Sequence, residues 1–134
     1  MSDMANMTAP FQCVILTEDE GGDSHFASGG MALALHDFAP PAPPFFVSAT
    51  QEASGYVVIH LPSKWVGDSN PSPHRQILFC LAGTLRVTAS DGDARTINIG
   101  DGLLMEDTRG NGHKSEVISG EPVVAVIIQL QQTD

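Results

Sequence analysis

The sequence predicts an all-β fold, and three observations lead to this prediction. Charged residues make up only 16 % of the 134 residues, whereas about a quarter is usual in globular proteins. Thirteen glycines and nine prolines supply residues for many turns. Short apolar runs recur between Asp-Gly and Asn-Gly turns, as is typical of a β-sandwich or β-barrel. At this length the chain is expected to form one domain.

The first part of the chain contains one clear strand and one proline-rich segment. Residues 1–10 are small, polar and rich in methionine, and we expect a flexible lead-in there, followed by one domain over residues 11–134. The apolar run at 11–16 is predicted to be a strand that ends in the acidic turn at 18–22. Because proline lacks the backbone N–H donor and fixes φ, residues 39–44 are expected to form an extended arm that crosses the surface or joins two sheets.

From Phe45 onward, apolar runs and turns alternate with a regular spacing. The turns are rich in Gly, Asp, Asn and Pro, the residues that tight turns favour. Each apolar run has the length of a strand, and none has the spacing of an amphipathic helix. We therefore predict strands at residues 56–61, 76–82, 84–88, 95–99, 102–105 and 122–130.

The charge and composition exclude several classes of partner. Sixteen acidic and six basic residues give a net charge of −10, which disfavours binding to nucleic acids and anionic membranes. No apolar run reaches the roughly 20 residues that span a bilayer, and residues 1–10 lack the pattern of a signal peptide. We therefore expect a cytoplasmic protein. Its two cysteines are too few for a disulfide scaffold, and Cys80, inside an apolar run, is expected to be a buried free thiol.

Three motifs occur in order along the chain. They are FAPPAPP at 38–44, RQILFCLAG at 75–83 and GDGLLMEDTRGNGH at 100–113. In this order they resemble the cupin superfamily, whose members are small β-barrels of the jelly-roll type, and more narrowly a group of small single-domain cupins. The resemblance runs from about residue 24 to residue 130. It implies a jelly-roll fold but no single activity, because cupins host many different functions.

The resemblance also implies a divalent metal site, built from three histidines and one carboxylate inside the barrel. The first metal-binding motif of cupins has a His-x-His pair followed by a glutamate. In this chain Asn70 and Ser72 stand in place of the pair, and Gln76 stands in place of the glutamate. Only His113 matches an expected ligand as itself. Amide oxygens are weak ligands for transition metals. A bound Fe, Mn, Ni or Zn ion would therefore depend on His113, Gln76 and, as a substitute ligand, His74.

Side chains alternate along the strand that contains RQILFCLAG, which places Gln76 and Cys80 on one face. The resemblance implies that this face points into the barrel. The alternative for Gln76 is a buried amide with satisfied hydrogen bonds. We expect a substrate to be bound by Asn70, Gln76, His60 and Cys80. The alternatives are that His60 is a hydrogen-bonded histidine of the core or of a sheet edge, and that His74 is a loop residue.

His113 is the predicted acid/base residue, and Glu106 is the second candidate for this role. Because Glu106 and Asp107 lie close to His113 in the sequence, one of the two carboxylates could instead orient the imidazole. The alternatives are that His113 is a turn residue and that the carboxylates belong to a solvated turn. Trp65 and Tyr56 are expected to pack rather than to recognise a ligand.

These observations lead to three hypotheses about function. The first is an enzyme of lyase, isomerase or oxygenase type that acts on a small organic molecule in its central cavity, without a nucleotide cofactor. The second is a non-catalytic cupin that binds or senses a ligand after losing its metal site. The third is a structural role, in which the chain forms a homodimer through the arm at 38–46.

Overall fold

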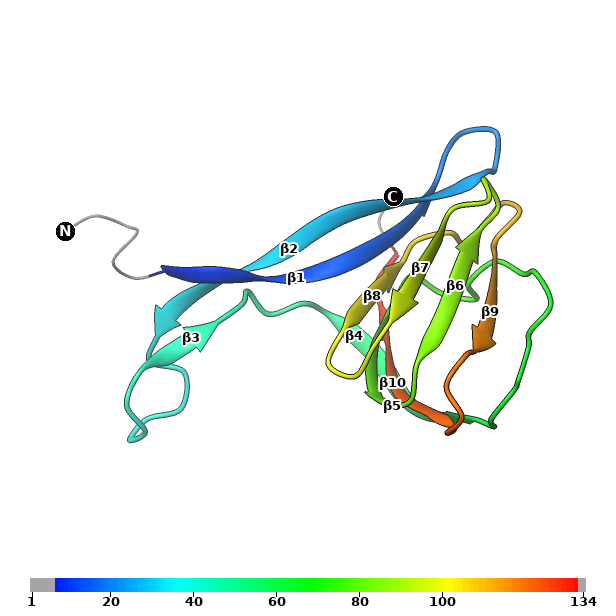
Figure 1. Cartoon of the computed structure of the whole chain (residues 1–134). Helices are drawn as coiled ribbons and strands as arrows, with labels where there is room; N and C mark the ends of the chain where they lie inside the picture. The colour runs from blue at the N-terminus through cyan, green and yellow to red at the C-terminus, as the bar shows by residue number, and fades with distance from the viewer. Residues whose placement is uncertain (1–6, 133–134) are drawn as a thin grey trace.

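The structure is a computed structural model that describes residues 7–132. Every regular element in this range is a β-strand, so the all-β prediction is confirmed. No helix that could cross a membrane occurs in the described range. The strands are shown in Figure 1: β1 (Met7–Glu18), β2 (Ser24–His36), β3 (Phe45–Val47), β4 (Ala53–Leu61), β5 (Gln76–Ala82), β6 (Leu85–Ala89), β7 (Ala94–Ile97), β8 (Gly102–Met105), β9 (His113–Val117) and β10 (Val123–Leu130).

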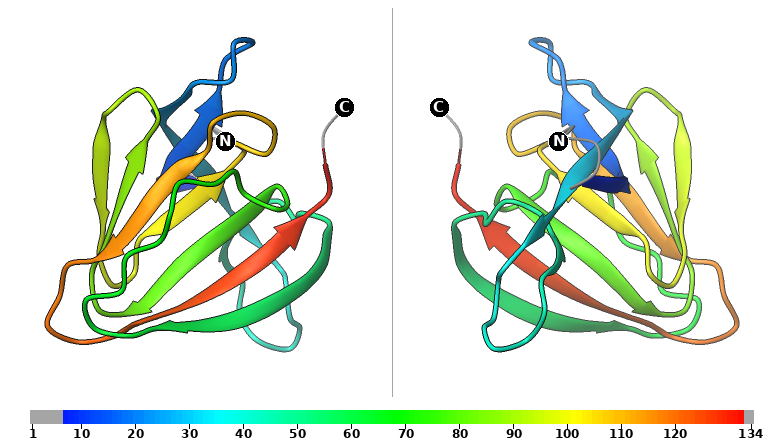
Figure 2. Two further views of the ribbon diagram at one scale, coloured as in Figure 1. Left: turned by 90° about the vertical axis from the view of Figure 1, so that its right-hand side faces the viewer. Right: turned by 90° about the vertical axis from the view of Figure 1, so that its left-hand side faces the viewer.

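The strands form two sheets of unequal size. The larger sheet has the order β3-β2-β1-β8-β5-β10-β4, and the smaller one has the order β7-β6-β9. Neighbouring strands run antiparallel except for β1 and β8, which are parallel. Figure 2 shows the two sheets wrapped around a common interior, as expected for a jelly roll. Apolar side chains from both sheets therefore meet in one place.

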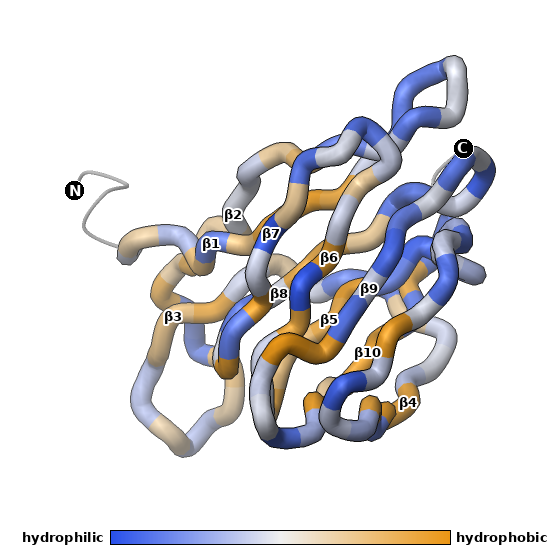
Figure 3. Tube along the Cα trace, turned by 45° about the vertical axis from the view of Figure 1, so that its right-hand side comes forward, coloured by the Kyte–Doolittle hydropathy of each residue, from blue (hydrophilic) through white to orange (hydrophobic). Residues whose placement is uncertain are grey.

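The core lies between the two sheets and is apolar. Leu78 and Leu103 of the larger sheet and Val87 and Ile97 of the smaller one are at most 2 % exposed. Strand β5 is apolar on both faces, because Leu78 points into the core while Phe79 points to the outer side of the larger sheet. In Figure 3 the apolar residues concentrate on β5, β10 and β4, and the connecting turns are hydrophilic.

The apolar pattern predicts most strands of the body but misses β9, and in the ribbon it misses β2 and the short β3. The predicted strands at 76–82 and 102–105 coincide with β5 and β8. The pattern does not predict β2, which is rich in Ala, Ser and Gly and is half-buried or exposed beyond the buried Ser24, or β9, whose sequence is HKSEV. Both strands form because they pair with a neighbouring strand in register, β2 with β1 and β9 with β6.

Strands β1, β2 and β3 form a ribbon that projects from the body of the molecule (Figure 1). Strand β1 begins at Met7, inside the segment expected to be a lead-in, because Met7 pairs with Ala34 of β2. Residues 1–6 lie outside the described residues. The proline-rich segment at 39–44 connects β2 to β3, which are neighbours in the same sheet. It therefore does not join two sheets, because these adjacent strands pair with each other.

Candidate functional site

A cavity of about 170 Å³ lies between the two sheets, and it contains the residues of the candidate site. Its walls are mostly apolar and include Leu78 of β5, Leu85 of β6 and Ile127 of β10. Polar side chains reach it from the segment before β5, from β5 itself and from the start of β9. Those that matter here are Asn70, Ser72, Gln76 and His113.

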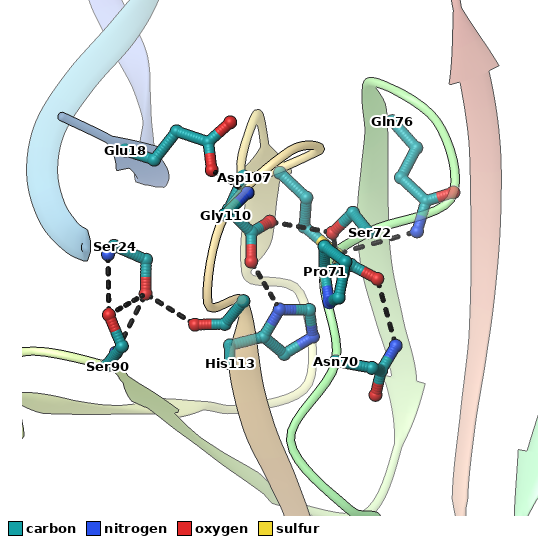
Figure 4. A network of polar contacts seen from close by, with 12 residues as sticks. Glu18, Ser24, Asn70, Pro71, Ser72, Gln76, Ser90, Asp107, Gly110 and His113 are labelled. Atoms are coloured by element: carbon teal, nitrogen blue, oxygen red, sulfur yellow. Dashed lines mark hydrogen bonds and ion pairs between the residues drawn. The ribbon is translucent and has the colours of Figure 1, made fainter. Parts of the chain in front are cut away.

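The central feature of the cavity is a histidine held by a buried carboxylate. Nδ1 of His113 lies 2.6 Å from Oδ2 of Asp107, and the Asp107 residue is 0 % exposed. The other oxygen of Asp107 accepts a hydrogen bond of 2.7 Å from Oγ of Ser72. Figure 4 shows these three side chains as one connected set, drawn from three separate segments of the chain. Each oxygen of the buried carboxylate therefore has a partner.

The backbone around His113 fixes the position of its side chain. His113 and Asn70 exchange backbone hydrogen bonds of 3.0 and 3.1 Å. Gly112 has a φ of 74°, and a Cβ atom at this position would lie 2.1 Å from the carbonyl carbon of Asn70. Glycine is required here, because it has no Cβ atom to meet the backbone of Asn70 and it adopts a positive φ without strain. Oγ of Ser24, which is fully buried, donates a hydrogen bond of 2.6 Å to the carbonyl oxygen of Gly112.

The second ring nitrogen of His113, Nε2, has no hydrogen-bond partner within the described residues. Every fully buried side-chain nitrogen or oxygen in that range has a partner. Nε2 is therefore accessible from the cavity that His113 lines. Gln76 lines the same cavity and is 6 % exposed, and its amide nitrogen lies 3.5 Å from the sulfur of Met105. The carbonyl oxygen of Gln76 likewise has no hydrogen-bond partner among the described residues, so it can accept a hydrogen bond from a ligand.

Three of the residues predicted for the site share this cavity, namely His113, Gln76 and Asn70. Asn70 lies at its exposed edge, where its side-chain amide donates to the carbonyl oxygen of Pro71 at 2.9 Å. Gln76 is buried with the same orientation as Leu78, as the alternation along β5 predicts. His113 stands at the beginning of β9 rather than in a turn.

The structure places the other predicted binding residues elsewhere. His60 is exposed, because its neighbours Ile59 and Leu61 occupy the cavity side of β4. His74 is exposed on the connection before β5 and does not line the cavity. Cys80 is 1 % exposed and belongs to the core, where its sulfur contacts the carbonyl oxygens that follow it. Burial raises the pKa of the Cys80 thiol, as is expected of an inert cysteine.

Glu106 also lies away from His113. Its carboxylate forms an ion pair of 2.9 Å with Nε of Arg75 on the outer side of the larger sheet, and both side chains are partly exposed. Alternation along the chain explains this result, because Met105 and Asp107 are turned inward and Glu106, between them, is turned outward. Of the two carboxylates considered from the sequence, Asp107 is therefore the one that orients the imidazole.

The sequence does not predict that Trp65 lines the cavity. Trp65 lines the cavity beside Gly67 and remains 36 % exposed, and Tyr56 is 74 % exposed, so neither ring is part of the core. The segment that carries Trp65 has no strand pattern, yet it pairs locally with β9 through Val66 and Glu116. A single tryptophan followed by Gly67 was the only signal available in the sequence.

The donor set in the cavity does not fit the metal site that the resemblance implies. His113 is the only imidazole that lines the cavity, and Gln76 adds a neutral amide. No group of three or more His, Cys, Asp or Glu side chains within residues 7–132 is arranged to hold a metal ion. Zn, Fe, Mn and Ni sites in proteins are built from several imidazole, thiolate or carboxylate donors, and His74 does not supply a second imidazole here.

No family model and no curated protein matches this sequence. Several solved structures are similar to it. The cupin domain of Cnp3 from Schizosaccharomyces pombe is 16 % identical over 92 % of this chain and 86 % of that chain, with a TM-score of 0.47. A domain of CENP-C from Drosophila melanogaster is 11 % identical over 87 % and 72 %, with a TM-score of 0.47. Protein NMB1881 from Neisseria meningitidis is 18 % identical over 61 % and 83 %, with a TM-score of 0.43. Structures of cupin domains, the superfamily that the motifs resemble, are thus among those similar to this chain.

Proposed function

We propose that this chain binds a small organic molecule in the cavity between its sheets, and that His113 transfers a proton to or from that molecule. The observation that supports this proposal is the short contact of 2.6 Å between Nδ1 of His113 and the buried carboxylate of Asp107. A histidine whose one nitrogen is held by a carboxylate has a fixed ring orientation and a fixed tautomer.

The arrangement suits general acid–base chemistry. As a carboxylate, Asp107 accepts hydrogen bonds only, so Nδ1 of His113 carries a proton and donates it to Oδ2. The lone pair then resides on Nε2, the atom that is accessible from the cavity. A ligand with an acidic C–H or O–H group next to Nε2 would lose its proton to the imidazole. Of the enzyme types considered from the sequence, lyases and isomerases need such a base.

Hydrogen exchange on cyclohexanone tests this proposal. The protein is incubated with cyclohexanone in D₂O, and loss of the C–H signals next to the carbonyl is followed by proton NMR. In each exchange the base removes a proton from carbon, an enolate forms, and the carbon takes a deuteron in return. We expect the wild-type protein to exceed the buffer rate, and His113→Asn to lose about 10²-fold or more of this excess. Equal rates for wild type and His113→Asn would overturn the proposal.

The non-catalytic alternative is favoured by one specific observation, namely the three neutral residues Asn70, Ser72 and Gln76 at the positions of the expected metal ligands. Under this alternative the cavity binds a ligand without turnover, and His113 serves as a hydrogen-bonding group. Cyclohexanone that binds in the cavity, detected through shifts of the His113 ring signals in NMR, but exchanges at the buffer rate would support this alternative over catalysis.

We further propose that the chain forms a homodimer through its ribbon of β1, β2 and β3. Residues 26–51 carry one charged side chain, Asp37, although the chain has a net charge of −10. Phe38, Phe45 and Phe46 of this segment are between 41 % and 59 % exposed. Two copies with the same large negative charge repel each other elsewhere, so the ribbon, which carries few charges, is the surface on which they can meet.

A groove beside the ribbon supplies the complementary surface. It has a volume of about 770 Å³ and is lined by Met31 and Phe46 of the ribbon and by Ile77 and Phe79 on the outer side of the larger sheet. A two-fold interface requires ridge and groove on the same surface of one copy, and both lie here. A second copy would therefore place its ribbon in this groove.

Sedimentation velocity at micromolar concentration tests the dimer. We expect the wild-type chain to sediment as a dimer and Phe46→Asp to sediment as a monomer, because a buried unpaired carboxylate opposes the contact. Ile99→Asp is the matched control, since Ile99, between β7 and β8, is 67 % exposed and does not line the groove. A monomeric wild type, or a Phe46→Asp variant that remains dimeric, would contradict the proposal.

A further inference from the structure

The cavity next to His113 is selective in size and in charge, and its walls indicate which ligands it accepts. We infer that its ligand is an uncharged ring compound with one polar substituent, seated against the indole of Trp65. This inference rests on the proposed function, because it concerns the molecule that His113 would act on. It is carried by three features of the cavity, namely its volume, the charges on its lining and the fixed position of Trp65.

The volume limits the ligand to a single ring. The cavity measures about 170 Å³, and an engineered apolar cavity of about 150 Å³ binds benzene. The walls that surround this space are aliphatic, with Leu61 of β4, Leu78 of β5 and Ile127 of β10 among them. A six-membered ring therefore fills the space inside the molecule, whereas most of a nucleotide or a sugar phosphate would lie outside the solvent-exposed edge of the cavity.

The charges on the lining exclude anionic ligands. No lysine or arginine lines this cavity, so a carboxylate or phosphate would be buried without a counter-ion. Such burial costs several kcal/mol. The uncharged acceptor and donor groups that are present, Nε2 of His113 and the amide of Gln76, suit a hydroxyl or carbonyl substituent instead.

Within the described residues, the cavity also lacks a buried carboxylate that could pair with a cationic ligand. Asp107 already accepts hydrogen bonds from Ser72 and His113. Asp68, the acidic residue that does line the cavity, is exposed to solvent at its edge. An ammonium group inside the cavity would therefore lose its hydration without gaining an ion pair. The cavity therefore disfavours both anions and cations, and we expect its ligand to be uncharged.

Trp65 forms a wall that is held in place by its neighbours. The indole lies on Gly67, so that a Cβ atom at position 67 would be 2.5 Å from the ring. The backbone below the ring is fixed to β9, because Val117 donates to the carbonyl oxygen of Trp65 and Gly67 donates to that of Ser115, each at 2.9 Å. A ligand in the cavity would pack on the face or edge of this indole.

Trp65 also provides the measurement, because it is the only tryptophan in the chain. Its fluorescence is followed while the full-length protein is titrated with cyclohexanol, cyclohexanecarboxylate or cyclohexylammonium, which share one ring and differ in charge. We expect a saturable change with cyclohexanol and dissociation constants about tenfold or more higher for the two charged compounds. Gly67→Ala, which displaces the indole, is expected to weaken the binding of cyclohexanol by about fivefold or more.

Gly120→Ala is the control for Gly67→Ala, because nothing lies within 4 Å of a Cβ atom at position 120. If Gly67→Ala does not fold, Trp65→Phe replaces it and binding is measured by calorimetry, again with weaker binding expected. Charged compounds that bind as tightly as cyclohexanol would overturn the inference, as would cyclohexanol that does not bind or binds without changing Trp65 fluorescence. Cyclohexanol has no acidic C–H group, so its binding can succeed even when exchange on cyclohexanone fails, and the two proposals are judged separately.

Discussion

His113, the first residue of β9, contacts Asp107 in the connection between β8 and β9, with 2.6 Å between Nδ1 of the imidazole and Oδ2 of the carboxylate. Ser72 completes the surroundings of the carboxylate through its hydroxyl group, at 2.7 Å, and through its backbone N–H, which donates to the carbonyl oxygen of Asp107 at 3.0 Å. The carboxylate thus has no solvent contact and a defined partner on each oxygen. Its removal is expected to change the chemistry of the histidine more than the shape of the cavity.

Asp107→Asn tests this expectation. An asparagine at this position can turn its NH₂ group toward Nδ1, which moves the imidazole proton to Nε2 and removes the base from the cavity. We expect the exchange of cyclohexanone to fall by about 10²-fold or more, while the binding of cyclohexanol changes little. Proton NMR gives the first quantity and Trp65 fluorescence the second. An exchange rate equal to that of the wild type would mean that Asp107 has no positioning role.

Glu106→Gln is the matched variant at the neighbouring position. It breaks the ion pair between Glu106 and Arg75, whose side chains are 30 % and 19 % exposed. A partly exposed pair contributes about 0–1 kcal/mol, so we expect a small loss of stability in urea unfolding and no change in the exchange of cyclohexanone. A loss of exchange comparable to that of Asp107→Asn would show that the catalytic role predicted for Glu106 from the sequence is the correct one.

Gly112→Ala is expected to disturb the site through the backbone. A side chain at position 112 would meet the backbone of Asn70 in addition to adopting a φ of 74°. Gly100→Ala is the control, because Gly100 has a φ of 89° with nothing within 4 Å of its Cβ position. We expect a loss of about 1 kcal/mol for Gly100→Ala from the strain of the left-handed region alone. A larger loss is expected for Gly112→Ala in chemical denaturation, and equal losses would contradict the close approach.

Leu16→Ala tests the core away from the cavity. Leu16 of β1 is 0 % exposed and belongs to the hydrophobic cluster between the sheets. Truncation of such a leucine costs about 2–5 kcal/mol, because it leaves a cavity. Val58→Ala on β4 is the control, since Val58 is 63 % exposed, and its cost should stay within about 0.5 kcal/mol. Urea unfolding followed by circular dichroism measures both losses. Similar unfolding midpoints for the two variants would contradict the assignment of Leu16 to the core.

The cysteines give a prediction about pH. Burial raises the pKa of the Cys80 thiol; a hydrogen bond to the backbone of Ala82 lowers it by less, and the charge of Asp101 adds a still smaller increase. The native thiol therefore stays protonated at a pH where an unfolded thiol, with a pKa of about 8.5, is ionised. The stability that Cys80 contributes is complete below that pKa and is lost as the pH rises toward the native value.

Two measurements check this prediction. In a Cys13→Ser variant at pH 8, we expect iodoacetamide to label Cys80 slowly in the native protein and rapidly in guanidinium chloride. We also expect the native protein to lose stability between neutral and alkaline pH more steeply than a Cys80→Ala variant does. Rapid labelling of the native protein would contradict the burial of Cys80, which is 1 % exposed.

The sequence predicts the parts of the fold that depend on local pattern. Strands β5 and β8 follow from their apolar runs and from the turns beside them. Alternation along β5 then places Gln76 in the cavity together with His113. Strand β9 has the polar sequence HKSEV and is formed by its pairing with β6. No single-strand pattern reports such pairing.

The site is predicted less completely, for two physical reasons. Strand β4 is apolar at almost every position from Tyr56 to Leu61, so its pattern does not say which face is buried, and His60 proves to lie on the exposed one. The choice between Glu106 and Asp107 depends on where the chain leaves β8, and only the buried contact of Asp107 with Ser72 decides it. Trp65 reaches the cavity through the pairing of its segment with β9, which the sequence does not indicate.

The hydrogen bond from Ser24 to the carbonyl oxygen of Gly112 spans 88 positions of the chain, and that from Ser72 to Asp107 spans 35. Both contacts therefore join segments that lie far apart in the sequence. The surroundings of His113 are complete only when the start of β2 and the segment before β5 are both in place. The NMR signals of this imidazole therefore report on native contacts of distant parts of the chain and not only on strand β9.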